Sequence, residues 1–237
     1  RNDSEKVTDH LFNIATDGQH FRARGKAISA RESYGQVLDK FRSLIAGLAI
    51  DGDDIIEGLQ IDLASPIADR KRIDFFASRG EHYSAKVITR YFQNRGMNAD
   101  LMLPEDIGFF VSDRFGNAKV LPATHTNLKE SLKDGRISII PGYYGMTLKG
   151  DIAVLSRGGS DLTGGEVAFA MDASCYENWT DTDGVFQVDP RIIPEASVIP
   201  VLTYKEIRLL SSKGFNVFHF DAMVSCKNKG IPINIRN

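Results

Sequence analysis

From residue 72 onward, short apolar runs alternate with longer stretches of helical periodicity. The expected strands are residues 73–77, 99–103, 137–140, 152–155 and 174–179, and the expected helices are about 81–95 and 161–172. This alternation predicts an α/β fold, a three-layer sandwich in which helices cover a mostly parallel central sheet. Ligands of such sheets bind outside the carboxyl ends of the strands, so residues that follow strands are the candidates for a functional site.

Residues 1–70 have the pattern of amphipathic helices. Segment 30–48 places apolar side chains at helical spacing, and Asp51-Gly52-Asp53-Asp54 interrupts the pattern. The aspartates suit either a calcium loop or a turn with a helix cap. The remaining positions of a calcium loop are missing, which favours the turn.

Composition excludes several classes of function. The chain has 237 residues, of which 42% are hydrophobic, and its 29 Lys and Arg nearly balance its 31 Asp and Glu. This balance argues against a nucleic-acid partner. No apolar run is long enough for a membrane span, and the 5 histidines lack metal-site spacing. Only Cys175 and Cys226 are present, which fits a reducing, cytoplasmic compartment.

The most specific motif is Arg157-Gly158-Gly159-Ser160-Asp161, between a β-branched strand and a helix. The glycines let the backbone approach a ligand, and the helix N-terminus favours an anion. Arg157 offers a planar fork for a carboxylate or phosphate, and Asp161 could cap the helix or orient a cation. The structural alternative is a glycine-rich turn with a good cap.

A second motif runs from Trp179-Thr180-Asp181 through Asp183-Gly184 to Arg191. The aspartates have the spacing to bond sugar hydroxyls, and Arg191 could reach phosphates. A hairpin built on Asp183-Gly184 explains the same residues, and the two interpretations stay open. The Asn178-Trp179-Thr180 glycosylation sequon is interpreted as chance.

A third motif, around Gly80-Glu81, is interpreted as a strand, a glycine and the first turn of a helix. The helix macrodipole favours a carboxylate there, which is a sufficient structural reason for Glu81. The functional alternative is an acceptor for a substrate ammonium. His82 is expected to be a surface or packing residue.

Together the three motifs resemble the aspartokinases, members of the amino-acid kinase family. The motif at 157–161, followed by Thr163, is the more specific part, whereas the segment at 180–191 also looks like glutamate 5-kinases. The turn at 141–145 and Val7-Thr8-Asp9 also match in order. The resemblance covers essentially the whole chain, loosely over 14–70 and closely from 72 onward.

The resemblance implies ATP- and Mg²⁺-dependent phosphorylation of the L-aspartate side chain to 4-phospho-L-aspartate, the first step of lysine, threonine and methionine biosynthesis, in a homo-oligomer. Residues 1–150 would form the amino-acid lobe and 151–237 the nucleotide lobe. Glu81 would take the α-ammonium, Arg157 the α-carboxylate, and Asp161 would organise the reacting groups. The implied aspartate contacts are Thr8, Glu81, Tyr143 and Arg157, and the implied nucleotide contacts are Gly158, Gly159, Ser160, Thr180, Asp181, Phe186, Arg191 and Asn216.

Three departures from the family pattern accompany the resemblance. The N-terminal strand with its Lys-Phe-Gly-Gly segment is absent, and regulatory ACT domains would follow Asn237. Asn216 stands where relatives often carry a lysine near the nucleotide, a charge that Lys213 could replace. We therefore expect residues 1–237 alone to be nearly inactive. The alternative functions are a glutamate-type or acetylglutamate-type kinase and a non-catalytic relative that binds nucleotide or amino acid.

Overall fold

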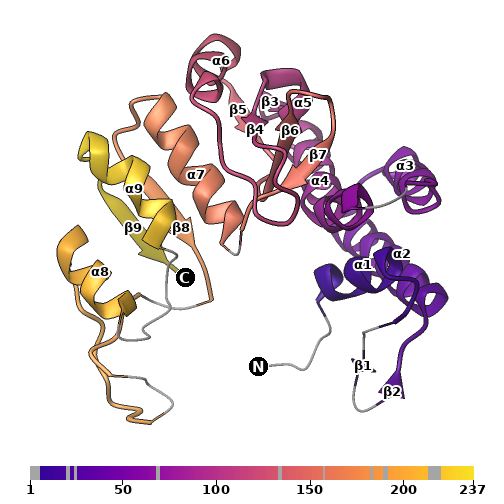
Figure 1. Cartoon of the computed structure of the whole chain (residues 1–237), viewed down its shortest axis with the longest axis horizontal. Coiled ribbons are helices and arrows are strands. Elements are labelled where there is room, and N and C mark those ends of the chain that lie inside the picture. The colour runs from indigo at the N-terminus through magenta and orange to yellow at the C-terminus, as the bar shows by residue number, and fades with distance from the viewer. Residues whose placement is uncertain are drawn as a thin grey trace. The chain divides into compact units, whose positions relative to one another are not determined.

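The chain divides into two compact units, Arg1–Ser156 and Arg157–Asn237, in a computed structural model (Figure 1). The structure describes residues 6–19, 22–23, 26–67, 70–132, 135–156, 158–181, 184–188, 192–212 and 220–237. Within these ranges, no helix is both long and apolar enough to cross a bilayer. The assignment of one lobe to the amino acid and one to the nucleotide stays a prediction.

Four helices form one part of the first unit. They are α1 (Val7–Ala15), α2 (Ala30–Leu48), α3 (Asp53–Leu63) and α4 (Arg70–Asn94), with the short antiparallel strands β1 (Arg22–Ala23) and β2 (Lys26–Ala27) between α1 and α2. A capping box of Ser29 and Glu32 begins α2, and left-handed Ala49 ends it, so the helix predicted at 30–48 is confirmed. The aspartates that follow serve as the turn and first residues of α3.

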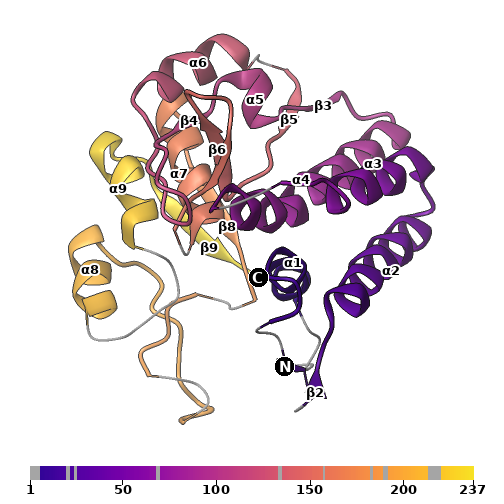
Figure 2. The ribbon, with the colours of Figure 1, turned by 45° about the vertical axis from the view of Figure 1, so that its right-hand side comes forward.

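Apolar faces of these helices meet in one core. Helix α1 packs on both α2 and α4, and α3 packs on α4 (Figure 2). Burying these side chains contributes most of the free energy that holds the short helices in place. The fully buried members include Leu11, Val37, Leu59, Phe76 and Val87.

Helix α4 differs from the prediction. Residues 73–77, expected as a strand, belong to its first two turns, and Glu81 lies in its middle rather than in a first turn. The macrodipole argument for Glu81 was therefore wrong. The cause of the error is packing on more than one side. Helix α4 packs on other helices and on strand β7 (Ile152–Val154), so Phe75, Phe76 and Ala77 are apolar in succession, as in a buried strand. Gly80, expected to precede the helix, instead lies close to Val7 and Leu11 of α1.

The strands of the first unit form two small sheets. Strand β3 (Ala99–Leu101) pairs in parallel with β5 (Ile137–Ile139). Strand β4 (Phe110–Val111) pairs in parallel with β6 (Tyr144–Thr147), and β6 pairs antiparallel with β7. Helices α5 (Pro104–Ile107) and α6 (Ala123–Ser131) lie between these strands in the chain. Strands predicted at 99–103, 137–140 and 152–155 are thus confirmed with shorter bounds.

The second unit repeats the strand-and-helix pattern. Helix α7 (Gly159–Ala170) is followed by β8 (Tyr176–Trp179), α8 (Tyr204–Ser212), α9 (Phe220–Lys229) and β9 (Ile233–Arg236). Strands β8 and β9 are parallel, and α9 packs on both α7 and α8. The helix predicted at 161–172 and the strand predicted at 174–179 are confirmed with shifted bounds, and the α/β fold class is confirmed as well. Ala168 of α7, Cys226 of α9 and Ile231, which precedes β9, form a buried core of this unit.

The approach of β6 to β4 gives a stability prediction. A Cβ atom on Gly145 would lie 2.6 Å from the Phe109 backbone oxygen. Because that oxygen belongs to the backbone next to β4, Gly145→Ala should lower the free energy of unfolding by about 1–3 kcal/mol, measured by denaturant titration. The control is Gly35→Ala in α2, where a Cβ meets open space and should stabilise the protein by about 0.5–1 kcal/mol. Equal effects of the two changes would contradict the packing argument.

Candidate functional site

Glu81 carries a buried carboxylate oxygen that nothing in the described part of the chain satisfies. Its Oε2 atom has no hydrogen-bond partner there, and burial raises the pKa of the carboxyl from 4.5 to about 7. An unpaired buried carboxylate oxygen is unfavourable in an isolated fold. A perturbed carboxyl of this kind is typical of a binding or catalytic site, where a cationic group of a ligand would complete its bonding.

Tyr143 packs against the cluster of Ala77, Tyr144 and Val154 in an unusual backbone conformation, and Ala77 lies one helical turn before Glu81 on α4. Its φ angle is 77°, in the left-handed region that disfavours side chains other than glycine, asparagine and aspartate. The backbone N–H of Leu155 donates to the Tyr143 carbonyl at 2.7 Å and helps to hold this geometry. Burial raises the pKa of Tyr143 to about 12, and the Glu81 charge adds to the rise, which indicates that the two side chains are near each other. The phenol therefore stays protonated and can donate a hydrogen bond.

The neighbours of Glu81 on α4 have partners within the fold. His82 Nδ1 lies 2.9 Å from the Tyr144 hydroxyl, and burial lowers the pKa of His82 to about 3, so the imidazole is neutral. Arg79 Nη1 donates to Asp62 at 2.8 Å, and its guanidinium lies over the Phe75 ring. His82 is thus the packing residue that the sequence indicated, and Arg79 is engaged by α3.

Thr8 lies in the first turn of α1, close to the same part of α4. Val7 and Leu11, which flank it on that helix, come nearest to Gly80, one residue before Glu81. The fold therefore brings the turn that carries Thr8 alongside the Gly80-Glu81 segment. Thr8, Glu81 and Tyr143, all predicted from sequence, belong to the first unit.

The glycine-rich motif lies at the start of α7 in the second unit. Gly158 adopts a left-handed φ of 79° and makes no side-chain cap, so the first N–H groups of α7 are left for other acceptors. Asp161 does not cap the helix. Its Oδ1 atom accepts from Asn178 Nδ2 at 2.9 Å, and the same nitrogen lies 3.2 Å from the Tyr176 hydroxyl. Arg157 lies outside the described residues.

Asn178 contacts the candidate residue Asp161, a contact that sequence reasoning missed. The sequence suggested only a chance glycosylation sequon, whereas the structure buries this side chain on β8 and bonds it to Asp161. The pairing of a helix residue with a strand residue 17 positions later leaves no local sequence signal. Asn178 thus fixes the direction of the Asp161 carboxylate.

The second motif continues the sheet at the end of β8. The Thr180 backbone N–H donates to the Arg236 carbonyl at 2.8 Å, and Asp181 follows as an exposed residue. Phe186 forms an isolated antiparallel bridge with Val198. Arg191, Asp183, Asn216 and Lys213 all lie outside the described residues, so the hairpin alternative and these nucleotide contacts stay predictions.

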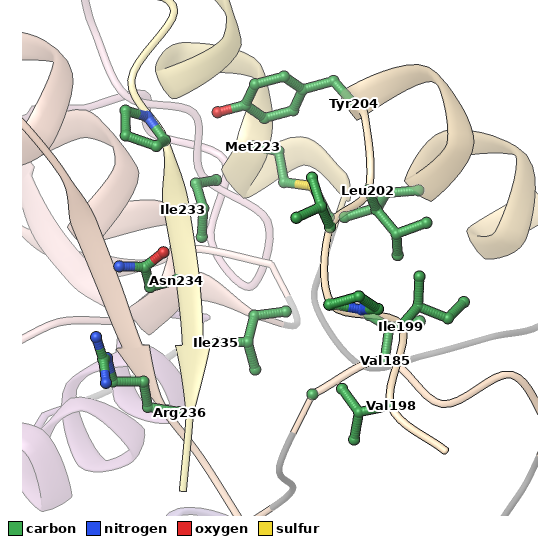
Figure 3. A pocket seen from close by; sticks show the side chains of 15 residues that line it. Val185, Val198, Ile199, Leu202, Tyr204, Met223, Ile233, Asn234, Ile235 and Arg236 are labelled. Carbon is green, nitrogen blue, oxygen red and sulfur yellow. The ribbon is translucent and has the colours of Figure 1, made fainter. Parts of the chain in front are cut away.

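A pocket of about 450 Å³ lies within the second unit (Figure 3). Side chains of β9 form one wall, and the segment that precedes α8 forms the opposite one, with Met223 and Tyr204 from α9 and α8 nearby. Sequence reasoning did not find this pocket, because its walls come from distant segments. The lining includes Val185, Val198, Ile199, Leu202, Ile233 and Ile235.

Comparison with known proteins gives concordant results. The family model described as "Amino acid kinase family" matches residues 6–237. Aspartokinase 3 of Bacillus subtilis is 37% identical over 237 residues, covering 98% of this chain and 51% of the relative. The chain therefore spans about half the length of this curated relative.

Solved structures support the same fold. The aspartate kinase of Clostridium acetobutylicum superposes with a TM-score of 0.80 at 29% identity, covering 100% of this chain and 51% of that one. Aspartokinase III of E. coli, crystallised with aspartate and ADP, gives a TM-score of 0.76 at 24% identity, covering 98% and 53%. At that identity the second likeness is evidence for the fold alone.

The raised pKa of Glu81 predicts a pH-dependent stability of the ligand-free protein. Folding raises this pKa, so the folded state binds the proton more tightly, and stability falls as pH rises from about 4.5 to about 7. Glu81→Gln cannot ionise and should make the protein about 1–3 kcal/mol more stable than wild type at pH 8, with the difference vanishing toward pH 4.5. Denaturant titrations across this range would measure it. The exposed Glu57→Gln is the control, and a pH-independent difference for Glu81→Gln would refute the prediction.

Proposed function

We propose that this chain, which belongs to the amino acid kinase family, is the catalytic part of an aspartokinase. The reaction is transfer of the γ-phosphoryl group of ATP to the side-chain carboxylate of L-aspartate. A carboxylate oxygen forms the new P–O bond, the bond to the β-phosphate oxygen breaks, and ADP leaves with its electron pair. The observation that carries the proposal is the buried Glu81 Oε2 atom, which has no partner among the described residues and suits the ammonium of an amino acid.

Aspartate recognition is assigned to four residues. Glu81 accepts the α-ammonium, and an arriving cation favours the ionised carboxylate that burial otherwise penalises. Tyr143 donates from its protonated phenol, and Thr8 lines the same region from α1. Arg157 forks onto the α-carboxylate, a role that rests on the sequence motif. Amino-acid binding then leaves the side-chain carboxylate as the acceptor.

Nucleotide recognition is assigned to the second unit. The uncapped N–H groups at the start of α7, with Gly158, Gly159 and Ser160, suit phosphate oxygens. The pocket beside β9 has the size and the mixed apolar and polar lining for a nucleoside base. Thr180, Asp181, Phe186, Arg191 and Asn216 are proposed around the nucleotide.

Charge neutralisation and positioning supply the catalysis. Phosphoryl transfer needs in-line placement of the reactants more than covalent help from the protein. Asp161, held by Asn178, orients the reacting groups from the start of α7. In the described ranges, no cluster of three or more His, Cys, Asp or Glu side chains could hold a metal. Mg²⁺ carried on the phosphates of ATP would neutralise their charge.

The wider setting follows from the proposed reaction. The product 4-phospho-L-aspartate would enter lysine, threonine and methionine biosynthesis, in the cytoplasm and in a homo-oligomeric protein. The competing assignment, a kinase of glutamate or acetylglutamate, predicts a different acceptor. Turnover of each amino acid with Mg·ATP, followed by ADP release from the protein expressed at its full natural length, separates them.

The assignment of the aspartate site predicts a selective kinetic defect. Glu81→Gln and Arg157→Ala should each lower kcat/KM for aspartate, by an amount equivalent to about 2–5 kcal/mol of transition-state free energy. Each change leaves a charged group of the substrate without its partner. Nucleotide affinity, measured by calorimetry, should change little. Succinate lacks the amino group. Its affinity as a competitor should therefore differ less between wild type and Glu81→Gln than the KM for aspartate does. Equal losses for aspartate and ATP in Arg157→Ala would move this residue to the nucleotide.

The assignment of the base pocket predicts the opposite selectivity. Ile199→Trp places a large side chain in the pocket while keeping the backbone bond from Ile199 N–H to the Val185 carbonyl. It should raise KM for ATP by about tenfold or more, because the indole fills the volume that the base would occupy. KM for aspartate should be nearly unchanged. Ile192→Trp, at a side chain 75% exposed in the same segment, is the control. Wild-type KM for ATP in Ile199→Trp would exclude this pocket as the base site.

A further inference from the structure

A second buried carboxylate on α4, that of Asp74, has no role in the site described above. The residue is 1% exposed. Its Oδ2 atom accepts the backbone N–H of Gly116 and the backbone N–H of Val154, each at 2.8 Å. One oxygen thus joins helix α4, strand β7 and the turn at 114–117, three segments distant in sequence. Burial raises the pKa of Asp74, and the two backbone bonds oppose that rise.

The strand that Asp74 holds is the strand that holds Tyr143. Val154 is the register partner of Tyr144, and the next residue, Leu155, donates its N–H to the Tyr143 carbonyl. Asp74 is therefore linked to Tyr143 by two hydrogen bonds and by the peptide unit between Val154 and Leu155. The charge of Asp74 also adds to the raised pKa of Tyr143.

Helix α4 carries the other end of the arrangement. Asp74 and Glu81 lie about two helical turns apart on one face of the same continuous helix. The carboxylate of Asp74 thus fixes how far the backbone of α4 lies from β7. That spacing in turn fixes Glu81, on the helix, relative to Tyr143, against the strand.

We infer that Asp74 is a positioning residue that sets the separation of Glu81 and Tyr143, and through it the affinity for the amino-acid substrate. This inference rests on the proposed aspartate site. The chemistry requires an acceptor of one particular length. Asparagine keeps an oxygen at the same distance from the helix, and that oxygen can accept both N–H groups. Glutamate keeps the charge but lengthens the tether by one methylene, and alanine removes the acceptor.

The test is a series of variants in the protein expressed at its full natural length. Asp74→Glu and Asp74→Ala should raise KM for aspartate by about tenfold to a hundredfold, since displacements on the order of 1 Å have effects of this size. Asp74→Asn should keep KM for aspartate within about threefold of wild type, because the amide oxygen replaces the carboxylate oxygen as acceptor. KM for ATP should be unchanged in all three variants.

The control separates positioning from loss of stability. Thr124, which is fully buried in the same unit, exchanges two hydrogen bonds with the backbone of Phe110, and Thr124→Val removes both. This variant should lower the melting temperature without changing KM for aspartate. If Asp74→Ala does not fold, the comparison of Asp74→Glu with Asp74→Asn decides the question.

Two failures can be told apart. A wild-type protein that does not phosphorylate aspartate would overturn the proposed function. If the wild-type protein does phosphorylate aspartate, two results would overturn the role of Asp74 alone. One is a wild-type KM for aspartate in Asp74→Glu, and the other is a parallel rise of the KM values for aspartate and ATP in that variant. A raised KM for aspartate in Asp74→Asn equal to that in Asp74→Ala would also overturn it, because the acceptor would then not be the feature that matters.

Discussion

Desolvation of the charged side chains along α4 is the constraint on which the first unit depends. A helix that packs on other helices and on a strand removes its polar groups from water, and each must find a partner or lose its charge. Asp74 meets two backbone N–H groups, Arg79 meets Asp62, and His82 is neutral against Tyr144. At Glu81 the fold leaves one oxygen unsatisfied in the described structure. The proposed amino-acid site lies at this oxygen, the buried polar atom of α4 that has no partner in the described structure.

Local sequence signals predicted the elements whose limits are set locally. The helix at 30–48 was predicted from apolar side chains at helical spacing, and the capping box and left-handed residue at its ends are also short-range features. Helix α4 was missed in part because burial on more than one side removes the polar face that marks an amphipathic helix. Glu81 was therefore placed at a first turn that does not exist, and its role in the site stays a proposal. Its true distinction is burial, which depends on tertiary structure.

The second unit shows the same division between local and distant information. The turn at Gly158 was predictable, because a glycine pair between a strand and a helix is a local pattern. Asn178 and the pocket beside β9 were not predictable, because the contacts of each join segments well separated in sequence. Single-sequence reasoning thus proposed residues by their chemical groups and did not identify those that contact them in the fold. Asp74, bonded to Gly116 and Val154, belongs to the second kind.

The left-handed backbone of Tyr143 has a consequence for the evolution of this fold. A tyrosine at a φ of 77° stores conformational strain that glycine would release. The side chain also packs on the cluster of Ala77, Tyr144 and Val154, so a glycine there would release the strain but lose this packing. A lineage that keeps tyrosine retains the strained backbone together with the phenol. Among descendants, the identity of this residue would therefore separate those selected to keep the phenol from those that gave it up.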